Sequence, residues 1–171
     1  TIPAIIVGFF IYDFVSIYFR NIKIIAISSI VFAVILFFAD KKNSTNKSWQ
    51  NITFKESFLI GLWQVMAFIP GASRAGVTIT GARFLNFDRI NATKFSMLLS
   101  IPIILASLIL SLIDFYSIDG ARIDLYRSIF SATISFITAL FSINFLIKII
   151  QVTNFNIFII YRILLGITLL V

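Results

Sequence analysis

An apolar segment that is broken at its centre reads Gly61-Leu62-Trp63-Gln64-Val65-Met66-Ala67-Phe68-Ile69-Pro70-Gly71-Ala72-Ser73-Arg74-Ala75-Gly76-Val77-Thr78-Ile79-Thr80-Gly81. Pro70 cannot continue an incoming helix, and Gly71 permits a backbone turn that is closed to other residues. Ser73 can cap a helix that begins directly after it. This order of residues therefore predicts two helices joined by a tight turn.

Both arms of this segment are too short to cross a membrane. The arms, residues 55–69 and 73–85, are roughly 20 Å long at 1.5 Å per residue, whereas a hydrocarbon core is about 30 Å thick. Either the arms form one broken crossing, or they form a re-entrant hairpin whose tip lies at membrane depth. Five other segments reach spanning length, and we expect transmembrane helices at 2–19, 22–39, 92–113, 125–150 and 155–171.

The composition supports a lipid environment for these segments. Hydrophobic residues make up 60% of the chain and charged residues only 12%, whereas a soluble domain carries about a quarter charged residues. The exception is a polar loop at 40–54, which is rich in Lys, Asn and Ser. The predicted fold is an all-α, polytopic transmembrane bundle with a re-entrant helix pair, half of an inverted-repeat architecture. The chain has no cysteine and no histidine, which excludes thiolate chemistry and a histidine base.

The distribution of basic residues distinguishes the two geometries. With a re-entrant hairpin, one side of the membrane receives Lys41, Lys42, Lys47, Lys55, Arg83, Arg89, Lys94 and Lys148. The other side receives Arg20, Lys23, Arg122 and Arg127, together with three aspartates. This bias fits the positive-inside rule and favours the hairpin, because a single broken crossing would scatter it. The net charge of +7 is thus explained by loops and headgroups, and nucleic acid is not an expected partner.

The hairpin tip has the chemistry of an anion site. A helix that starts at Ser73 presents unpaired N–H groups and a positive dipole end, which suit a phosphate. Arg74 adds a permanent charge whose fork can grip two phosphate oxygens. The alternative to an anion site is a Pro-Gly kink in an ordinary helix, with the Arg74 side chain extending to the membrane interface. The adjacent Ser-Arg pair and the short arms favour the site.

The same stretch resembles the undecaprenyl-diphosphate phosphatase family, the bacitracin-resistance proteins of bacterial membranes. The family pattern has a Gln six residues before a Pro-Gly-x-Ser-Arg-Ser-Gly-x-Thr-Ile block, followed by a Phe-Ser-x-x-Leu-x-x-Pro helix. The matching positions are Gln64, Pro70, Gly71, Ser73, Arg74, Gly76, Thr78, Ile79, Phe95, Ser96, Leu99 and Pro102. Weaker matches are Ile2-Pro3-Ala4 and Tyr161-Arg162. The second Ser of the block is Ala75 here, so one hydroxyl donor is absent.

The resemblance implies a hydrolase of the bacterial inner membrane that removes the terminal phosphate of undecaprenyl diphosphate and yields the carrier lipid for cell-wall synthesis. In that role Arg74 and Ser73 are the expected catalytic residues. The expected substrate-binding residues are Gly71, Ala75, Gly76, Thr78 and Gln64.

The family's first re-entrant segment, with its glutamate pair, has no match in this chain. The chain begins Thr1-Ile2-Pro3 within an apolar run, so a further N-terminal part is expected. That part is expected to hold the ligands of a divalent cation, Mg²⁺ or Ca²⁺, with no metal ligand in this chain. The nucleophile is expected there or is a water, and this chain alone is expected to be inactive. Undecaprenyl diphosphate and membrane lipid are the expected partners, and a homodimer is left open.

Two questions stay open in the sequence. A transporter or flippase would bind the same anion without cleaving it, because re-entrant arms from inverted repeats are also transporter architecture. Arg162 lies within an apolar segment, where it either contacts a headgroup, extends to the interface or has an internal partner. Asp88 with Arg89 is expected to supply a helix cap and a loop charge.

Overall fold

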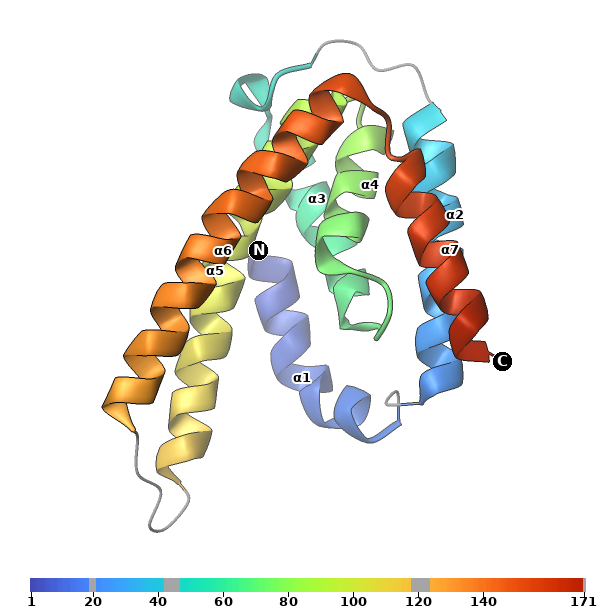
Figure 1. The fold of residues 1–171 in the computed structure, drawn as a ribbon. Coiled ribbons are helices and arrows are strands. Elements are labelled where there is room, and N and C mark those ends of the chain that lie inside the picture. Colours follow the sequence, from blue (N-terminus) through green and yellow to red (C-terminus); the bar gives the residue numbers. More distant parts are fainter. Residues whose placement is uncertain (19–20, 42–46, 118–123, 171) are drawn as a thin grey trace.

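The chain folds into a bundle of α-helices (Figure 1), as predicted. The structure is a computed structural model that describes residues 1–18, 21–41, 47–117 and 124–170, without the side chains of 12–18 and 49. Its helices are α1 (Ile2–Tyr18), α2 (Ile22–Lys41), α3 (Phe54–Val65), α4 (Arg74–Phe84), α5 (Arg89–Tyr116), α6 (Leu125–Val152) and α7 (Asn156–Leu170). Two short 3₁₀ turns, η1 (Trp49–Asn51) and η2 (Met66–Phe68), precede and follow α3.

Three of these helices, α2, α5 and α6, are long and apolar enough to cross a membrane. They have 20, 28 and 28 residues. Helices α1 and α7, which were also expected to span, have 17 and 15 residues, and their described apolar parts are shorter than a typical span. Spanning by α1 and α7 therefore stays a prediction.

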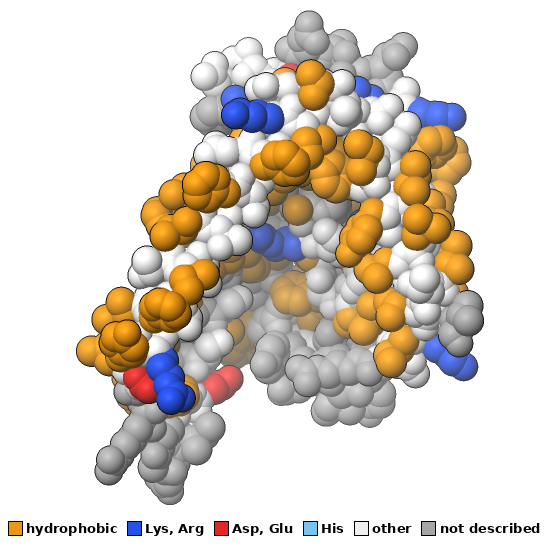
Figure 2. Space-filling view, in the orientation of Figure 1, with side chains coloured by type: hydrophobic (Ala, Val, Ile, Leu, Met, Phe, Trp, Pro, Cys, Tyr) orange, Lys and Arg blue, Asp and Glu red, His pale blue; other side chains and the backbone are white. Residues whose placement is uncertain are grey.

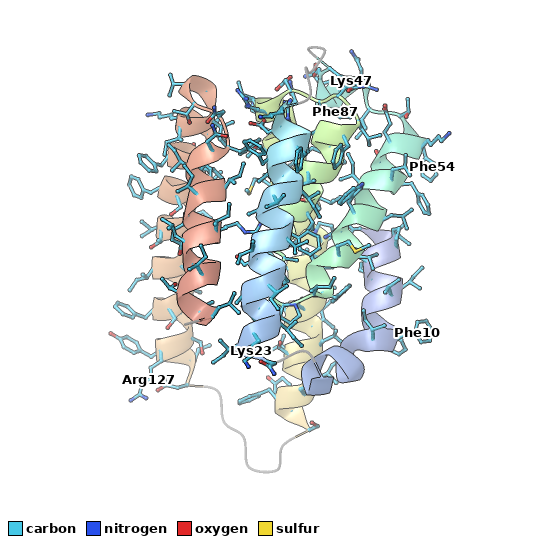
Figure 3. The ribbon with its side chains drawn as sticks, turned by 90° about the vertical axis from the view of Figure 1, so that its right-hand side faces the viewer. Phe10, Lys23, Lys47, Phe54, Phe87 and Arg127 are labelled. Carbon is cyan, nitrogen blue, oxygen red and sulfur yellow. The ribbon has the colours of Figure 1, made fainter. Side chains whose placement is uncertain are left out.

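Helices α3 and α4 form a hairpin whose two open ends lie at the same end of the bundle. They have 12 and 11 residues, or roughly 18 and 17 Å of length. Figure 1 shows the connecting turn inside the outline of the bundle, well short of the far ends of α5 and α6. In Figure 3, Phe54 and Phe87 flank the hairpin near Lys47, while Lys23 and Arg127 lie at the opposite end. The two helices therefore run antiparallel, as expected for the hairpin, and its re-entrant placement in a membrane stays a prediction.

The outgoing arm packs closely on the incoming one because a glycine faces an aromatic ring. A Cβ added to Gly81 would come within 2.6 Å of the Trp63 side chain. The ring of Trp63 in turn lies 5.6 Å from that of Phe84, measured between centroids. The hairpin is therefore closed by side-chain packing along its length, as expected where small residues bring helices together.

The region predicted as a polar loop, 40–54, is shorter than expected. Helix α2 continues to Lys41, and residues 42–46 lie outside the described part of the chain. Helix α3 starts at a capping box in which Thr53 and Glu56 exchange side-chain to backbone hydrogen bonds. Lys47 also contacts the Glu56 carboxylate, and these hydrogen bonds hold the pKa of Glu56 below its usual value.

The tip of the hairpin is a tight turn with two residues at positive φ. The Ala72 N–H donates to the Ile69 carbonyl at 3.0 Å, across Pro70 and Gly71. Gly71 has φ +91°, which with Pro before it fits a type II turn. A Cβ at Gly71 would lie 2.3 Å from the Ile25 carbonyl oxygen of α2, so only glycine fits this place.

A buried ionic network joins the surface ends of four helices. Asp40 of α2, 6% exposed, receives a bidentate pair of hydrogen bonds from Arg89 at 2.8 and 3.0 Å. Arg83 of α4, 3% exposed, lies 3.2 Å from the same carboxylate and donates to the Asp40 backbone carbonyl at 2.9 Å. The Phe155 N–H, just before α7, is 3.4 Å from the carboxylate. Arg83 was counted among the basic residues on one side of the membrane, and the structure shows that its side chain is buried in this network. The Asp88 cap of α5 is confirmed.

We predict that the Asp40 network stabilises the bundle strongly. Replacing Asp40 with Asn should lower the unfolding free energy by about 3 kcal/mol, because both arginines lose the buried charge that they share. The matched control is Asp124→Asn, since the Asp124–Arg127 pair is exposed and asparagine still caps α6. Thermal unfolding in detergent followed by circular dichroism measures both variants. Equal melting temperatures would contradict the prediction.

We also predict that the turn tolerates no side chain at position 71. Gly71→Ala should cost more than about 2 kcal/mol, because alanine is disfavoured at positive φ and would clash with α2. Gly61→Ala is the control, since its added Cβ meets nothing nearer than 3.4 Å and alanine favours a helix. The same melting experiment should show a large decrease for the first variant and none for the second.

Candidate functional site

The N-terminus of α4 lies at the hairpin tip, inside the bundle. Ser73 precedes the helix and its Oγ accepts a hydrogen bond from the Gly76 N–H at 3.2 Å, which confirms the expected cap. The N–H groups of Arg74 and Ala75, in the first turn, have no acceptor within the helix because no turn precedes them. The tip therefore presents amide protons and the positive end of the helix dipole, the elements of an anion site.

Ser73 is held in an unusual conformation. Its φ is 66° and its ψ 111°, a region that residues with a side chain seldom occupy. Such strain costs on the order of 1–3 kcal/mol and is found most often at functional sites. The side chain is exposed, and because Oγ accepts from Gly76, its own proton remains available to donate to a ligand.

Arg74 is the first residue of α4 and is half-buried. Its guanidinium has no hydrogen bond or ion pair with any of the residues that the structure describes. A charge in an apolar bundle that forms no such pair is expensive, so a functional role is the default interpretation. The predicted cation is thus next to the amide protons and is available for a ligand.

A cavity of about 490 Å³ opens beside this tip, between α2, α4, α6 and α7. Figure 2 shows the surface hollowed between α6 and α7. Apolar side chains surround the hollow, and blue Lys or Arg side-chain atoms are visible inside it. Four predicted site residues line the cavity: Gly71, Ser73, Ala75 and Gly76. The rest of its wall is mainly apolar and consists of Ser29, Leu36, Ile79, Met97, Leu146, Ile150, Phe155, Phe158, Tyr161, Arg162 and Leu165.

The other three predicted residues, Arg74, Thr78 and Gln64, are not among those that line the cavity. Thr78 is 1% exposed, and its hydroxyl lies 2.6 Å from the Ser96 hydroxyl of α5 and donates to the Arg74 carbonyl at 3.0 Å. Gln64 of α3 is also 1% exposed, and neither atom of its amide has a hydrogen-bond partner among the described residues. Thr78 is therefore placed to support the first turn of α4. Contact of either residue with substrate stays a prediction.

The structure adds two residues that sequence reasoning did not assign. Arg162 of α7 donates from Nη2 to the carbonyls of Gly71 and Ala72 at 2.8 and 2.9 Å. Ser28 of α2 donates to the Pro70 carbonyl. Arg162 thus has an internal partner, which resolves the question left open above. The sequence features that could have indicated these two residues are an arginine, Arg162, and a serine pair, Ser28-Ser29, within apolar segments.

The carboxylates of this chain do not form a metal site in the described residues. No group of three or more His, Cys, Asp or Glu side chains lies close enough there to hold an ion. Asp40, the one buried carboxylate described above, is occupied by two arginines. The divalent cation implied by the resemblance therefore stays a proposal.

Comparison with known proteins places this geometry in a family. Residues 1–168 match the family described as bacitracin resistance protein BacA. Relatives named undecaprenyl-diphosphatase occur in Pelagibacter ubique, 38% identical over 100% of this chain and 67% of the relative, and in Jannaschia sp., 36% identical over 100% and 64%. A relative of the same name from Aliivibrio salmonicida is 40% identical over 99% of this chain and 63% of its own length.

The chain thus spans about two thirds of the length of the curated relatives that it matches. The match includes the whole hairpin, the three long apolar helices and the residues that surround the α4 N-terminus. A bundle of apolar helices with a helical hairpin turned back inside it agrees with a multi-pass protein of the bacterial inner membrane. The chain belongs to the bacitracin resistance protein BacA family.

Proposed function

We propose that this protein hydrolyses the terminal phosphoanhydride bond of undecaprenyl diphosphate, releasing phosphate and leaving undecaprenyl phosphate in the membrane. The observation that carries the proposal is the N-terminus of α4, capped by Ser73 and lining an apolar cavity, with Arg74 as the first residue of the helix. The relatives named undecaprenyl-diphosphatase supply the substrate class. The full-length protein is expected to carry the activity.

The residues at the tip stabilise charge on the terminal phosphate. Phosphoryl transfer needs donors and cations placed around three equatorial oxygens while the attacking and leaving oxygens lie in line. Arg74 supplies a fork that grips two oxygens, and the first N–H groups of α4 together with the Ser73 hydroxyl supply the remaining donors. A water oxygen bonds to the terminal phosphorus while the bond between that phosphorus and the bridging oxygen breaks. The lipid monophosphate leaves with the bridging oxygen, and the water oxygen leaves with the released phosphate, as a water proton passes to solvent.

A divalent cation, Mg²⁺ or Ca²⁺, would supply a further electrophile at the diphosphate. The residues described here do not offer a set of carboxylate ligands for it.

The cavity supports an amphiphilic substrate. Apolar side chains cover most of its wall, many of them from α6 and α7, and the α4 tip with Gly71, Ser73, Ala75 and Gly76 forms one part of it. An isoprenoid chain would lie against the apolar wall while its phosphates reach the amide protons. Carriage of the lipid without cleavage, the second function considered, would use the same cavity but release no phosphate. A homodimer stays a prediction.

The first test concerns Arg74. Arg74→Ala in the full-length protein should lower the rate of phosphate release from a polyprenyl diphosphate by at least about a hundredfold, because a transition-state donor is lost. Arg74→Lys should recover little, since a point charge cannot make the forked contact. Arg127→Ala, which removes an exposed arginine at the far end of the bundle, is the control. Full activity in Arg74→Ala would remove this residue from the mechanism, and binding without release by the wild type would favour carriage.

The second test restores the hydroxyl that the family pattern has at position 75. Ala75 lines the cavity in the first turn of α4, so a serine there can donate to the bound phosphate. One added hydrogen bond is worth about 1 kcal/mol, and Ala75→Ser should raise kcat/KM by roughly fivefold. The control is Ala82→Ser, which places a hydroxyl in the same helix, 0% exposed and remote from the tip. A lower kcat/KM in Ala75→Ser alone would contradict this role.

A further inference from the structure

The carbonyls of the hairpin turn are held from outside by two other helices. Ser28 of α2 donates to the Pro70 carbonyl, and Arg162 of α7 donates to those of Gly71 and Ala72. Three consecutive carbonyls that precede the α4 N-terminus are thus bound by side chains of the bundle. The amide protons that follow them point the other way along the chain and stay free for a ligand.

Arg162 is the more informative of the two contacts. It lies in the middle of an apolar helix, and the ion pairs among the described residues do not include it. An arginine at such a place is costly unless backbone carbonyls or a carboxylate accept from it. Its Nη2 donates to both turn carbonyls, so the guanidinium is bound to the backbone of the turn.

The second nitrogen of the same guanidinium lies against the first turn of α4. Nη1 is fully buried and has no hydrogen-bond partner among the described residues. A Cβ added to Gly76 would come within 2.9 Å of Nη1, so the absence of a side chain at Gly76 makes room for the guanidinium. Arg162 lines the cavity, but its Nη1 is buried and its Nη2 is bound to the two turn carbonyls, which argues for an indirect role.

Helix α7 is itself anchored to α2, so the contact has a rigid base. The Ser29 hydroxyl donates to the Arg162 carbonyl at 3.3 Å. A Cβ at Gly166 would lie 2.9 Å from the Ala26 carbonyl oxygen, which shows how closely the two helix backbones approach. The α2–α7 pair therefore fixes the position of the guanidinium, and the guanidinium fixes the turn.

We propose that Arg162 is a positioning residue for phosphate hydrolysis: it holds the Gly71 and Ala72 carbonyls so that the α4 amide protons and Arg74 face the terminal phosphate. The inference rests on the function proposed above. A displacement of about 1 Å in such donors is enough to lower a rate by roughly a hundredfold. Tail contacts in the apolar cavity would be unaffected, so the loss should fall on kcat and leave KM within about threefold.

The two arginines of the site should respond differently to lysine. Both carbonyls accept from the single Nη2 of Arg162, so one ammonium nitrogen that reaches the turn can replace it in part. Arg162→Lys should therefore recover at least about a tenth of the wild-type kcat, whereas Arg162→Gln should retain about a hundredth. At Arg74 the fork itself is needed, and lysine should recover little.

The test measures kcat, KM and amide hydrogen exchange in the full-length protein in nanodiscs. The variants are Arg162→Gln, Arg162→Lys and, as the control on the same helix, Thr168→Val, whose hydroxyl binds only the Leu165 carbonyl and is exposed. Phosphate release from a polyprenyl diphosphate gives the kinetic constants. Mass spectrometry of peptides that contain residues 71–76 gives the exchange rate of the turn.

We expect faster exchange confined to residues 71–76 together with the loss of kcat in Arg162→Gln, and an intermediate result in Arg162→Lys. Wild-type kcat or unchanged exchange in Arg162→Gln would overturn the inference, as would equal losses in the two variants. If Arg162→Gln does not fold, Arg162→Lys decides: exchange raised across every helix overturns the inference, and exchange raised only in the turn supports it. A wild type without phosphate release would refute the proposed function. The exchange data would still test whether Arg162 holds the turn.

Discussion

The arrangement of this protein depends on one constraint, which is that irregular backbone inside a bilayer must have its polar groups bound by protein. A hairpin that turns back at membrane depth exposes carbonyls and amide protons where no water is available to them. Here the turn binds its own Ala72 N–H, Ser28 and Arg162 bind the carbonyls, and Ser73 binds Gly76. The groups left over are the first amide protons of α4. These free amide protons form the candidate anion site.

The two arginines near the tip differ in what they contact. Arg162 lines the cavity but is bound to backbone carbonyls of the turn, whereas Arg74 has no partner among the described residues. Both add positive potential to the N-terminal end of α4, where the helix dipole is already positive. An anionic ligand would relieve this accumulation of like charge.

Much of the hairpin could be predicted from the order of a few residues. Pro70 and Gly71 predicted a turn and Ser73 a helix start, because each follows from backbone geometry that needs no partner. The short arms left a broken crossing and a hairpin open, and the distribution of basic residues favoured the hairpin. The structure confirms these elements. The sequence counted Arg83 only as a basic residue on one side of the membrane, and it did not indicate that the fold buries the side chain against Asp40, 43 residues away.

The sequence by itself therefore determined the apolar helices, the break at Pro70 and Gly71, the cap and the presence of a cation beside it, since these depend on local conformation and composition. Only the tertiary structure decided which side chains hold the turn, that Thr78 binds Ser96, and that Arg162 reaches back over 90 residues to Ala72. Those contacts join helices that are distant in the chain, and their choice depends on packing distances such as the close approach of α7 to α2 at Gly166. Residue order does not encode such distances, because the same apolar surfaces could pack in several registers.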